Sequence, residues 1–287
     1  WDLYMTQWHG IDNTQHAFLR FDKSVLTEKE AQVCDNVVLK TYEIADELVG
    51  DILQATKNAQ DPETYTIALS DHGHVMGKRR FFINAYLYQK GFIKLKRDND
   101  TNKVTVDWEN TLAFSQGMVH IYVNLKGRDP HGCVNPGKDH DEVVQQVIDA
   151  LYDAKDPKTG MRPIILALSN KDAEFIGLSG ERVGDVIFAA NPVYAGDNRL
   201  KVSGDMFEDL KVGFRDASIH GAQLPALDMG DFGTIKAMFI ASGPKIKKGH
   251  VLKKPINMVD IAPTISHILN IPGPKDCEGK ILHDIFE

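Results

Sequence analysis

The chain has 287 residues, of which 43% are hydrophobic and 25% are charged, so it is an ordinary globular protein that can bury a sizeable core. Its net charge of -7 argues against a general nucleic-acid-binding surface. No apolar run approaches the roughly 18 residues of a membrane span. The three cysteines are far apart and odd in number, so the sequence indicates neither a disulfide framework nor a cysteine metal site.

The first predicted element is a strand over residues 2–5, which leads into a segment with two polar groups of interest. Asp12 and His16 are four residues apart. They share one face if the chain enters a helical turn there. A carboxylate and an imidazole on one face are a plausible start of a metal site.

A long helix is predicted next, because residues 27–30 read Thr-Glu-Lys-Glu, the pattern of a capping box. Apolar residues then recur at near-helical spacing up to Ala55. This helix is expected to end before Asp61-Pro62. An apolar strand over residues 65–69 follows.

That strand runs into Ser70-Asp71-His72-Gly73-His74. In open α/β sheets the ligand crevice lies at the carboxyl ends of strands, and a glycine lets the backbone turn there. Asp71 and His72 suit a divalent ion of the zinc or manganese kind. The alternative is that Asp71 caps a turn and that His72 and His74 are ordinary polar residues at a strand end.

Residues 79–136 differ in character and are predicted to be an insertion or cap next to the site. Residues 94–103 are strongly charged and contain Asp98-Asn99-Asp100, which indicates a hairpin turn, and residues 103–107 alternate like a strand. Lys126 and Arg128 flank a glycine after a further strand and could hold a phosphate or carboxylate. A solvated loop is the alternative for both residues.

The remaining elements alternate between helix and strand. A helix is predicted from about Asp139, strands over residues 163–168 and 186–190, a strand over residues 237–241, and a last helix from about Asp260 to Leu269. For residues 163–168 a buried helix segment stays open. The alternation indicates an α/β fold with a mostly parallel central sheet flanked by helices.

The motifs, taken in order, resemble a known family. Asp-x-x-x-His, Ser-Asp-His-Gly, a late His-Gly and Phe-Ile-Ala-x-Gly-Pro are similar to the alkaline phosphatase superfamily, in the branch of type I phosphodiesterases and nucleotide pyrophosphatases. The matching residues are Asp12 and His16, Asp71 and His72, His220 and Gly221, and residues 239–244. Residues 121–128, 260–265 and 271–274 extend the likeness along the chain.

The resemblance implies two divalent metal ions, with zinc expected first and manganese or iron also open. One ion is expected at Asp12, His16 and His220, and the second at Asp71 and His72 with help from elsewhere. Two such ions about 4 Å apart can hold the attacking and leaving oxygens of a phosphoryl group in line. His74, Lys126 and Arg128 are expected to contact substrate, and for His74 a supporting role behind a ligand or a structural, hydrogen-bonded role is also open.

The chain also departs from the family. In relatives a further Asp and a Ser or Thr nucleophile precede the Asp-x-x-x-His motif, whereas here the only hydroxyls before Asp12 are those of Tyr4 and Thr6. Thr6 directly follows residues 2–5 in the strand expected to lead to Asp12, and not at a helix start, where a nucleophile is exposed and activated. Residues 1–287 are therefore expected to be the C-terminal part of one alkaline-phosphatase-like domain, inactive alone.

Two classes of function follow. The first is a metal-dependent hydrolase of phosphoric esters, acting on a small phosphorylated or nucleotide-like substrate, with a phosphomutase or sulfatase on the same scaffold as relatives. The second is a non-catalytic metal-binding or interaction domain. A zinc protease is disfavoured because the sequence has no His-Glu-x-x-His. The compartment is left open, with the cytoplasm favoured.

Overall fold

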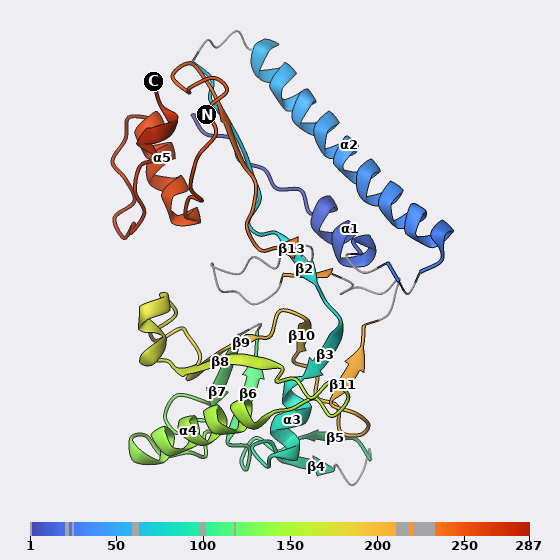
Figure 1. Ribbon diagram of the computed structural model, residues 1–287. Coiled ribbons are helices and arrows are strands. Elements are labelled where there is room, and N and C mark those ends of the chain that lie inside the picture. Colours follow the sequence, from blue (N-terminus) through green and yellow to red (C-terminus); the bar gives the residue numbers. More distant parts are fainter. Residues whose placement is uncertain are drawn as a thin grey trace. The chain divides into compact units, whose positions relative to one another are not determined.

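The computed structural model describes residues 2–20, 23–24, 26–58, 63–97, 102–117, 119–210, 218–220 and 233–287 (Figure 1). The chain divides into two compact units. The first comprises Trp1–His74 and Asp228–Glu287, and the second comprises Val75–Leu227. Among the described helices, none is both long enough and apolar enough to cross a bilayer.

The first unit combines helices with a two-stranded sheet. Its elements in chain order are α1 (Gly10–Phe18), α2 (Glu28–Asn58), β1 (Thr66–Leu69), β13 (Gly233–Thr234), β14 (Phe239–Ser242), η3 (Met258–Asp260), α5 (Ile261–Ile268) and η4 (His283–Ile285).

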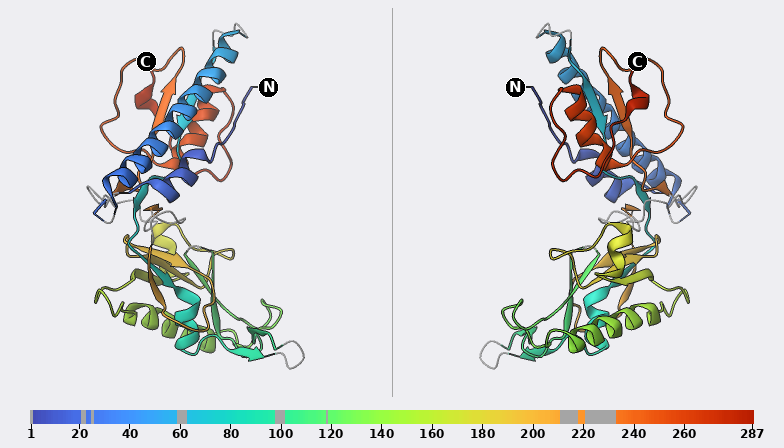
Figure 2. Two further views of the ribbon diagram at one scale, coloured as in Figure 1. Left: turned by 90° about the vertical axis from the view of Figure 1, so that its right-hand side faces the viewer. Right: turned by 90° about the vertical axis from the view of Figure 1, so that its left-hand side faces the viewer.

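The long helix α2 begins where the capping box predicts. The Glu30 amide donates to Thr27 Oγ1 at 3.3 Å, and the Thr27 amide donates to Glu30 Oε2 at 2.8 Å. These two bonds satisfy amides that the first helical turn leaves without partners. The predicted helix is confirmed, and both views in Figure 2 show it as one continuous rod.

The strand that precedes the Ser-Asp-His-Gly-His segment is also confirmed. β1 pairs antiparallel with β14, from Thr66 opposite Ser242 to Leu69 opposite Phe239. The Ser70 amide extends this ladder by donating to the Met238 carbonyl at 3.0 Å. The pairing therefore fixes where the polar segment after β1 begins.

The predicted last helix is confirmed as α5, with Pro263 in its first turn, where a missing amide proton costs nothing. The buried Asp260 carboxylate accepts the amides of Asn257 at 3.1 Å and Lys280 at 2.8 Å. Leu282 in turn donates to Thr264 Oγ1. These bonds hold the C-terminal residues against the start of the helix.

The second unit holds most of the strands. Its elements are β2 (His74–Met76, which follows directly from the first unit), β3 (Arg79–Phe82), α3 (Ile83–Gln89), β4 (Leu95–Arg97), β5 (Val104–Val106), β6 (Ala113–Gln116), β7 (His120–Val123), α4 (Lys138–Asp153), β8 (Ile164–Ser169), η1 (Asp172–Ile176), β9 (Val186–Ala190), β10 (Tyr194–Asp197), β11 (Phe207–Asp209) and β12 (Ser218–Ile219).

A four-stranded sheet in the order β6-β7-β9-β8 carries the main apolar core of this unit. α4 packs against the sheet and buries Val143, Val144, Val147, Ile148 and Leu151, as its apolar spacing predicts (Figure 2). The predicted strands at residues 163–168 and 186–190 are confirmed as β8 and β9. The predicted hairpin is confirmed by the antiparallel pair β4 and β5, although residues 98–101 of its turn lie outside the described residues.

The α/β class is confirmed, but the expected mostly parallel order is not what the described strands form. β10 pairs parallel with β3, whereas the sheet β6-β7-β9-β8 is antiparallel throughout. The reason is local. β6 and β7 are separated by a short turn, and such a connection can join only antiparallel neighbours.

The expected strand over residues 2–5 and the expected insertion over residues 79–136 have different outcomes. Residues 2–5 form no strand, since residues 2–9 have no ladder partner in the described chain and Leu3, Tyr4 and Met5 are each more than half exposed. That prediction was wrong, because apolar residues alone do not make a strand without a neighbour to bond. Residues 79–136 fall inside the second unit, and their origin as an insertion stays a prediction.

Candidate metal centre

The short helix α1 places Asp12 and His16 on one face, as their spacing predicts. A nine-residue helix is marginal alone, so its position depends on packing. α1 packs on α2, where Gln15 Nε2 donates to the Tyr42 hydroxyl at 2.8 Å and Thr41 Oγ1 donates to Thr14 Oγ1 at 3.2 Å. Packing on the long helix therefore fixes the orientation of α1, and with it the positions of Asp12 and His16.

A third polar side chain of the same unit converges on this pair. His74 Nε2 lies 3.1 Å from Asp12 Oδ1, and His16 Nε2 lies 3.4 Å from the same oxygen. The two imidazole rings meet edge to face with their centroids 4.8 Å apart. The side chains of His74, His16 and Asp12 are 3%, 12% and 28% exposed. One carboxylate and two imidazoles therefore lie together in a site that is largely shielded from solvent.

Asp71 and His72 lie three and two residues before His74 in the sequence. His72 Nε2 lies 3.4 Å from Asp71 Oδ2, and the His72 ring centroid is 5.7 Å from that of His74. The Asp71 side chain is 62% exposed, in contrast to Asp12. The predicted Asp71–His72 pair therefore exists as neighbouring side chains, but much of its carboxylate still faces solvent.

Gly73 explains how the chain turns between these groups. Its amide donates to the Ile235 carbonyl at 2.8 Å, and a Cβ at this position would lie 2.1 Å from the Thr234 carbonyl oxygen. Only glycine allows so close an approach of two backbones. This close contact fixes the position of the Gly73 backbone, and with it those of His72 and His74 on either side.

His220 follows β12 in the second unit. Its partner in the motif, Gly221, lies outside the described residues. A ligand role for His220 stays a prediction from the sequence.

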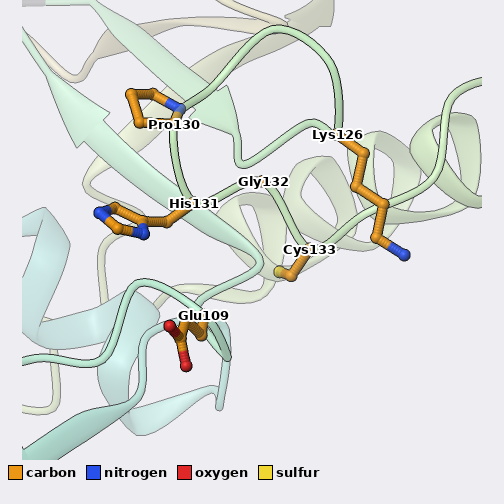
Figure 3. Close-up of a pocket in the computed structure, with 6 residues that line it drawn as sticks. All are labelled: Glu109, Lys126, Pro130, His131, Gly132 and Cys133. Carbon is orange, nitrogen blue, oxygen red and sulfur yellow. The ribbon is translucent and has the colours of Figure 1, made fainter.

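Lys126 borders a hollow of about 430 Å³ in the second unit. Its ammonium donates to Asn135 Oδ1 at 2.8 Å. Figure 3 shows Lys126 on one side of the hollow and Glu109 and His131 on the other. The lining therefore carries charges of both signs. The residues that line it are Glu109, Lys126, Pro130, His131, Gly132 and Cys133.

Arg128 directs most of its donors at neighbouring carboxylates. Nη1 and Nη2 each donate to an oxygen of Asp185 at 2.8 Å, and Nη2 also lies 3.1 Å from Asp129 Oδ2. The hydrogen bonds with Asp185 raise the pKa of Arg128 above its already high ordinary value. A substrate contact by Lys126 or Arg128 stays a prediction, and Arg128 would have to release carboxylate partners to make one.

Among these residues, the contact of His74 with Asp12 is the feature that sequence reasoning missed. The signal was present, because His72 and His74 alternate around a glycine directly after Asp71. The partner of His74, however, is 62 residues away in the sequence.

Comparison with known proteins gives a family match that covers the segments with these side chains. The model of the family described as type I phosphodiesterase / nucleotide pyrophosphatase matches residues 1–204. The chain belongs to this family. The match includes Asp12, His16 and Asp71 to His74 but ends before His220. The resemblance to type I phosphodiesterases and nucleotide pyrophosphatases is thereby confirmed.

A solved structure, that of a quadruple mutant of alkaline phosphatase PafA, is similar to the chain with a TM-score of 0.49 and 17% sequence identity. The alignment covers 96% of this chain and 46% of that one, so the chain spans less than half the length of the structure it matches. The comparison with curated proteins gave no match.

Proposed function

We propose that the intact protein is a metal-dependent phosphoester hydrolase of the phosphodiesterase or nucleotide pyrophosphatase kind, acting on a small phosphorylated or nucleotide-like substrate. The observation that carries the proposal is the convergence of Asp12 and His16 next to the Asp71–His72 pair, within one unit of a chain of this family.

The donor set fits divalent ions. One carboxylate oxygen and imidazole nitrogens are good zinc ligands, and manganese or iron accept the same donors. We assign Asp12, His16 and His220 to one ion, and Asp71 and His72 to a second. When bound, a pair of such ions neutralises the charge that spreads over the phosphoryl oxygens.

The side chains of this unit hold and orient that centre, but neither hydroxyl that precedes Asp12 in the sequence is placed as a nucleophile. Tyr4 and Thr6 lie in an exposed, extended segment ahead of α1, and neither stands at a helix start. We therefore propose that a Ser or Thr and a further Asp from another segment complete the second site, and that residues 1–287 alone are inactive.

The test compares the intact protein with residues 1–287. Both are stripped with a chelator, titrated with zinc, and assayed with a bis-aryl phosphodiester. We expect both to bind zinc and only the intact protein to hydrolyse the ester. Turnover by residues 1–287 would place the nucleophile inside this chain, and absence of zinc binding by both would refute the proposal.

Substitutions separate the two ions. We expect Asp12→Ala to weaken tight zinc binding by more than about 100-fold, beyond the loss typical of groups that only support a ligand. Asp71→Ala should affect only a weak second ion in residues 1–287, because Asp71 and His72 supply half a site. Asp46→Ala, an exposed carboxylate on α2, is the matched control. Equal losses in the Asp12 and Asp71 variants would contradict the division into two sites.

A non-catalytic metal-binding domain is the second candidate, favoured by the setting of Tyr4 and Thr6, the hydroxyls that precede Asp12, outside any helix start. It predicts zinc binding without turnover even in the intact protein. A phosphomutase or sulfatase on the same scaffold is separated by assaying phosphate transfer to an acceptor alcohol and hydrolysis of an aryl sulfate beside the diester.

A further inference from the structure

His74 is the most buried member of the cluster and was not assigned to either ion above. Its Nε2 atom and that of His16 approach the same oxygen, Asp12 Oδ1, at 3.1 and 3.4 Å. The candidate donor atoms of these three residues all lie within 4.8 Å of one another. Three donors from two separate segments therefore point at one small volume.

Two of the three distances among these atoms match a tetrahedral coordination geometry. Zinc is bound at about 2.0–2.1 Å in a tetrahedron, whose edges are then about 3.4 Å long. Both contacts to Asp12 Oδ1, at 3.1 and 3.4 Å, are close to that edge. A surface ion pair does not need a second imidazole at the same oxygen, whereas a tetrahedral site needs several donors at this mutual distance.

The two segments that supply the donors are anchored independently. Asp12 and His16 are held through the packing of α1 on α2. His74 is held by the turn at Gly73, whose amide donates to the Ile235 carbonyl. The three side chains are therefore brought together by the fold of the first unit and not by neighbouring positions in sequence.

We infer that His74 is a direct protein ligand of the ion held by Asp12 and His16. This assignment deepens the proposed function and rests on it for the role of the ion. Asp12, His16 and His74 then form a three-donor site inside the first unit. Three donors leave one position of a tetrahedral ion, which the proposed function assigns to His220.

The competing role for His74 is that of a positioning residue, which donates a hydrogen bond from Nε2 to Asp12 and leaves the ion to others. Glutamine distinguishes the two roles. Its amide nitrogen reaches about as far as Nε2 and can donate to Asp12, but a neutral amide is a poor zinc ligand. His250→Gln, in the same unit and outside the cluster, is the matched control.

The experiment titrates residues 1–287 with Co²⁺ and follows its visible absorption, with circular dichroism to confirm folding. We expect His74→Ala and His74→Gln both to lower the affinity by more than about 100-fold, beyond the loss typical of groups that only support a ligand, and to change the spectrum, and His250→Gln to behave as the unmodified chain. Unchanged affinity and spectrum in His74→Gln would overturn the ligand assignment.

Asp12→Ala separates this inference from the proposed function. If it abolishes Co²⁺ binding while both His74 variants bind normally, only the role of His74 is wrong. If Asp12→Ala also binds normally, the metal site of the proposed function itself fails, and the role of His74 with it.

A measurement on the unmodified chain does not depend on any variant folding. With an NMR-active cadmium isotope and isotopically labelled histidine nitrogens, we expect scalar coupling from the metal to Nε2 of both His16 and His74. Coupling to His16 without coupling to His74 would overturn the assignment.

Discussion

Replacing Arg128 with alanine should destabilise the second unit substantially. Arg128 makes a bidentate pair with Asp185, whose side chain is 9% exposed. Removing one partner of a buried ion pair costs about 3–5 kcal/mol. Arg128 is itself 37% exposed, and Asp185 keeps the Val123 amide at 2.7 Å and His140 Nε2 at 3.1 Å. Solvent screening and these remaining donors place the expected loss near the lower end, at about 3 kcal/mol.

The loss can be followed by urea unfolding and by thermal melting. For a unit of this size, about 3 kcal/mol corresponds to a fall of roughly 6–12 °C in melting temperature. Trp108, which packs on Phe114 with ring centroids 5.1 Å apart, reports on the second unit. Arg128→Lys should reduce stability less than Arg128→Ala, because lysine keeps the positive charge although it cannot make the bidentate pair.

Arg162→Ala is the control, because Arg162 is exposed in the same unit and should change stability by less than about 0.5 kcal/mol. If Arg128→Ala is no more destabilising than this control, the pairing with Asp185 does not stabilise the unit. The Arg128 donors would then be available to a substrate.

Two further predictions concern acid stability and helix capping. Burial alone would raise the pKa of Asp185, but hydrogen bonds from Arg128 and His140 outweigh it and lower that pKa. The stabilisation is therefore complete above the unfolded value of about 3.9 and is lost as the pH falls through the lower folded value. Melting temperatures should fall below about pH 4 and fall less in Asp185→Asn; equal falls would contradict this. Thr27→Ala should cost about 1 kcal/mol and reduce helicity, measured by circular dichroism, with Thr27→Ser nearly unchanged; equal effects of the two would refute the cap.

The parts of the fold that the sequence predicts are those set by neighbours in the chain. The capping box at Thr27, the apolar spacing of α4 and the separation of Asp12 from His16 each depend on one helical segment. Sheet order depends on partners far away in sequence. The same run that reads as a parallel strand can pair in an antiparallel sheet, as β8 does with β9.

The site divides in the same way. Asp12 and His16 are predictable because four residues of helix bring them together. His74 joins them across 62 residues, through a turn that only Gly73 allows and a strand pair that the sequence does not specify. Arg128 likewise meets Asp185 across 57 residues, so its sequence context suggested a free cation where the fold supplies a counter-ion.

The two halves of the candidate centre place different demands on the rest of the protein. Asp12, His16 and His74 are mostly shielded and come from a single unit, and both imidazoles approach one oxygen of Asp12. On our assignment, the fold of that unit therefore brings the donors together before the ion binds. Asp71 is 62% exposed with His72 as its neighbouring donor, and an exposed carboxylate keeps its hydration unless further ligands displace it. On the proposed function, in-line phosphoryl transfer between two ions needs both sites filled, so metal binding and turnover would be separable properties. The first depends on residues already converged, and the second on donors that Asp71 and His72 do not supply.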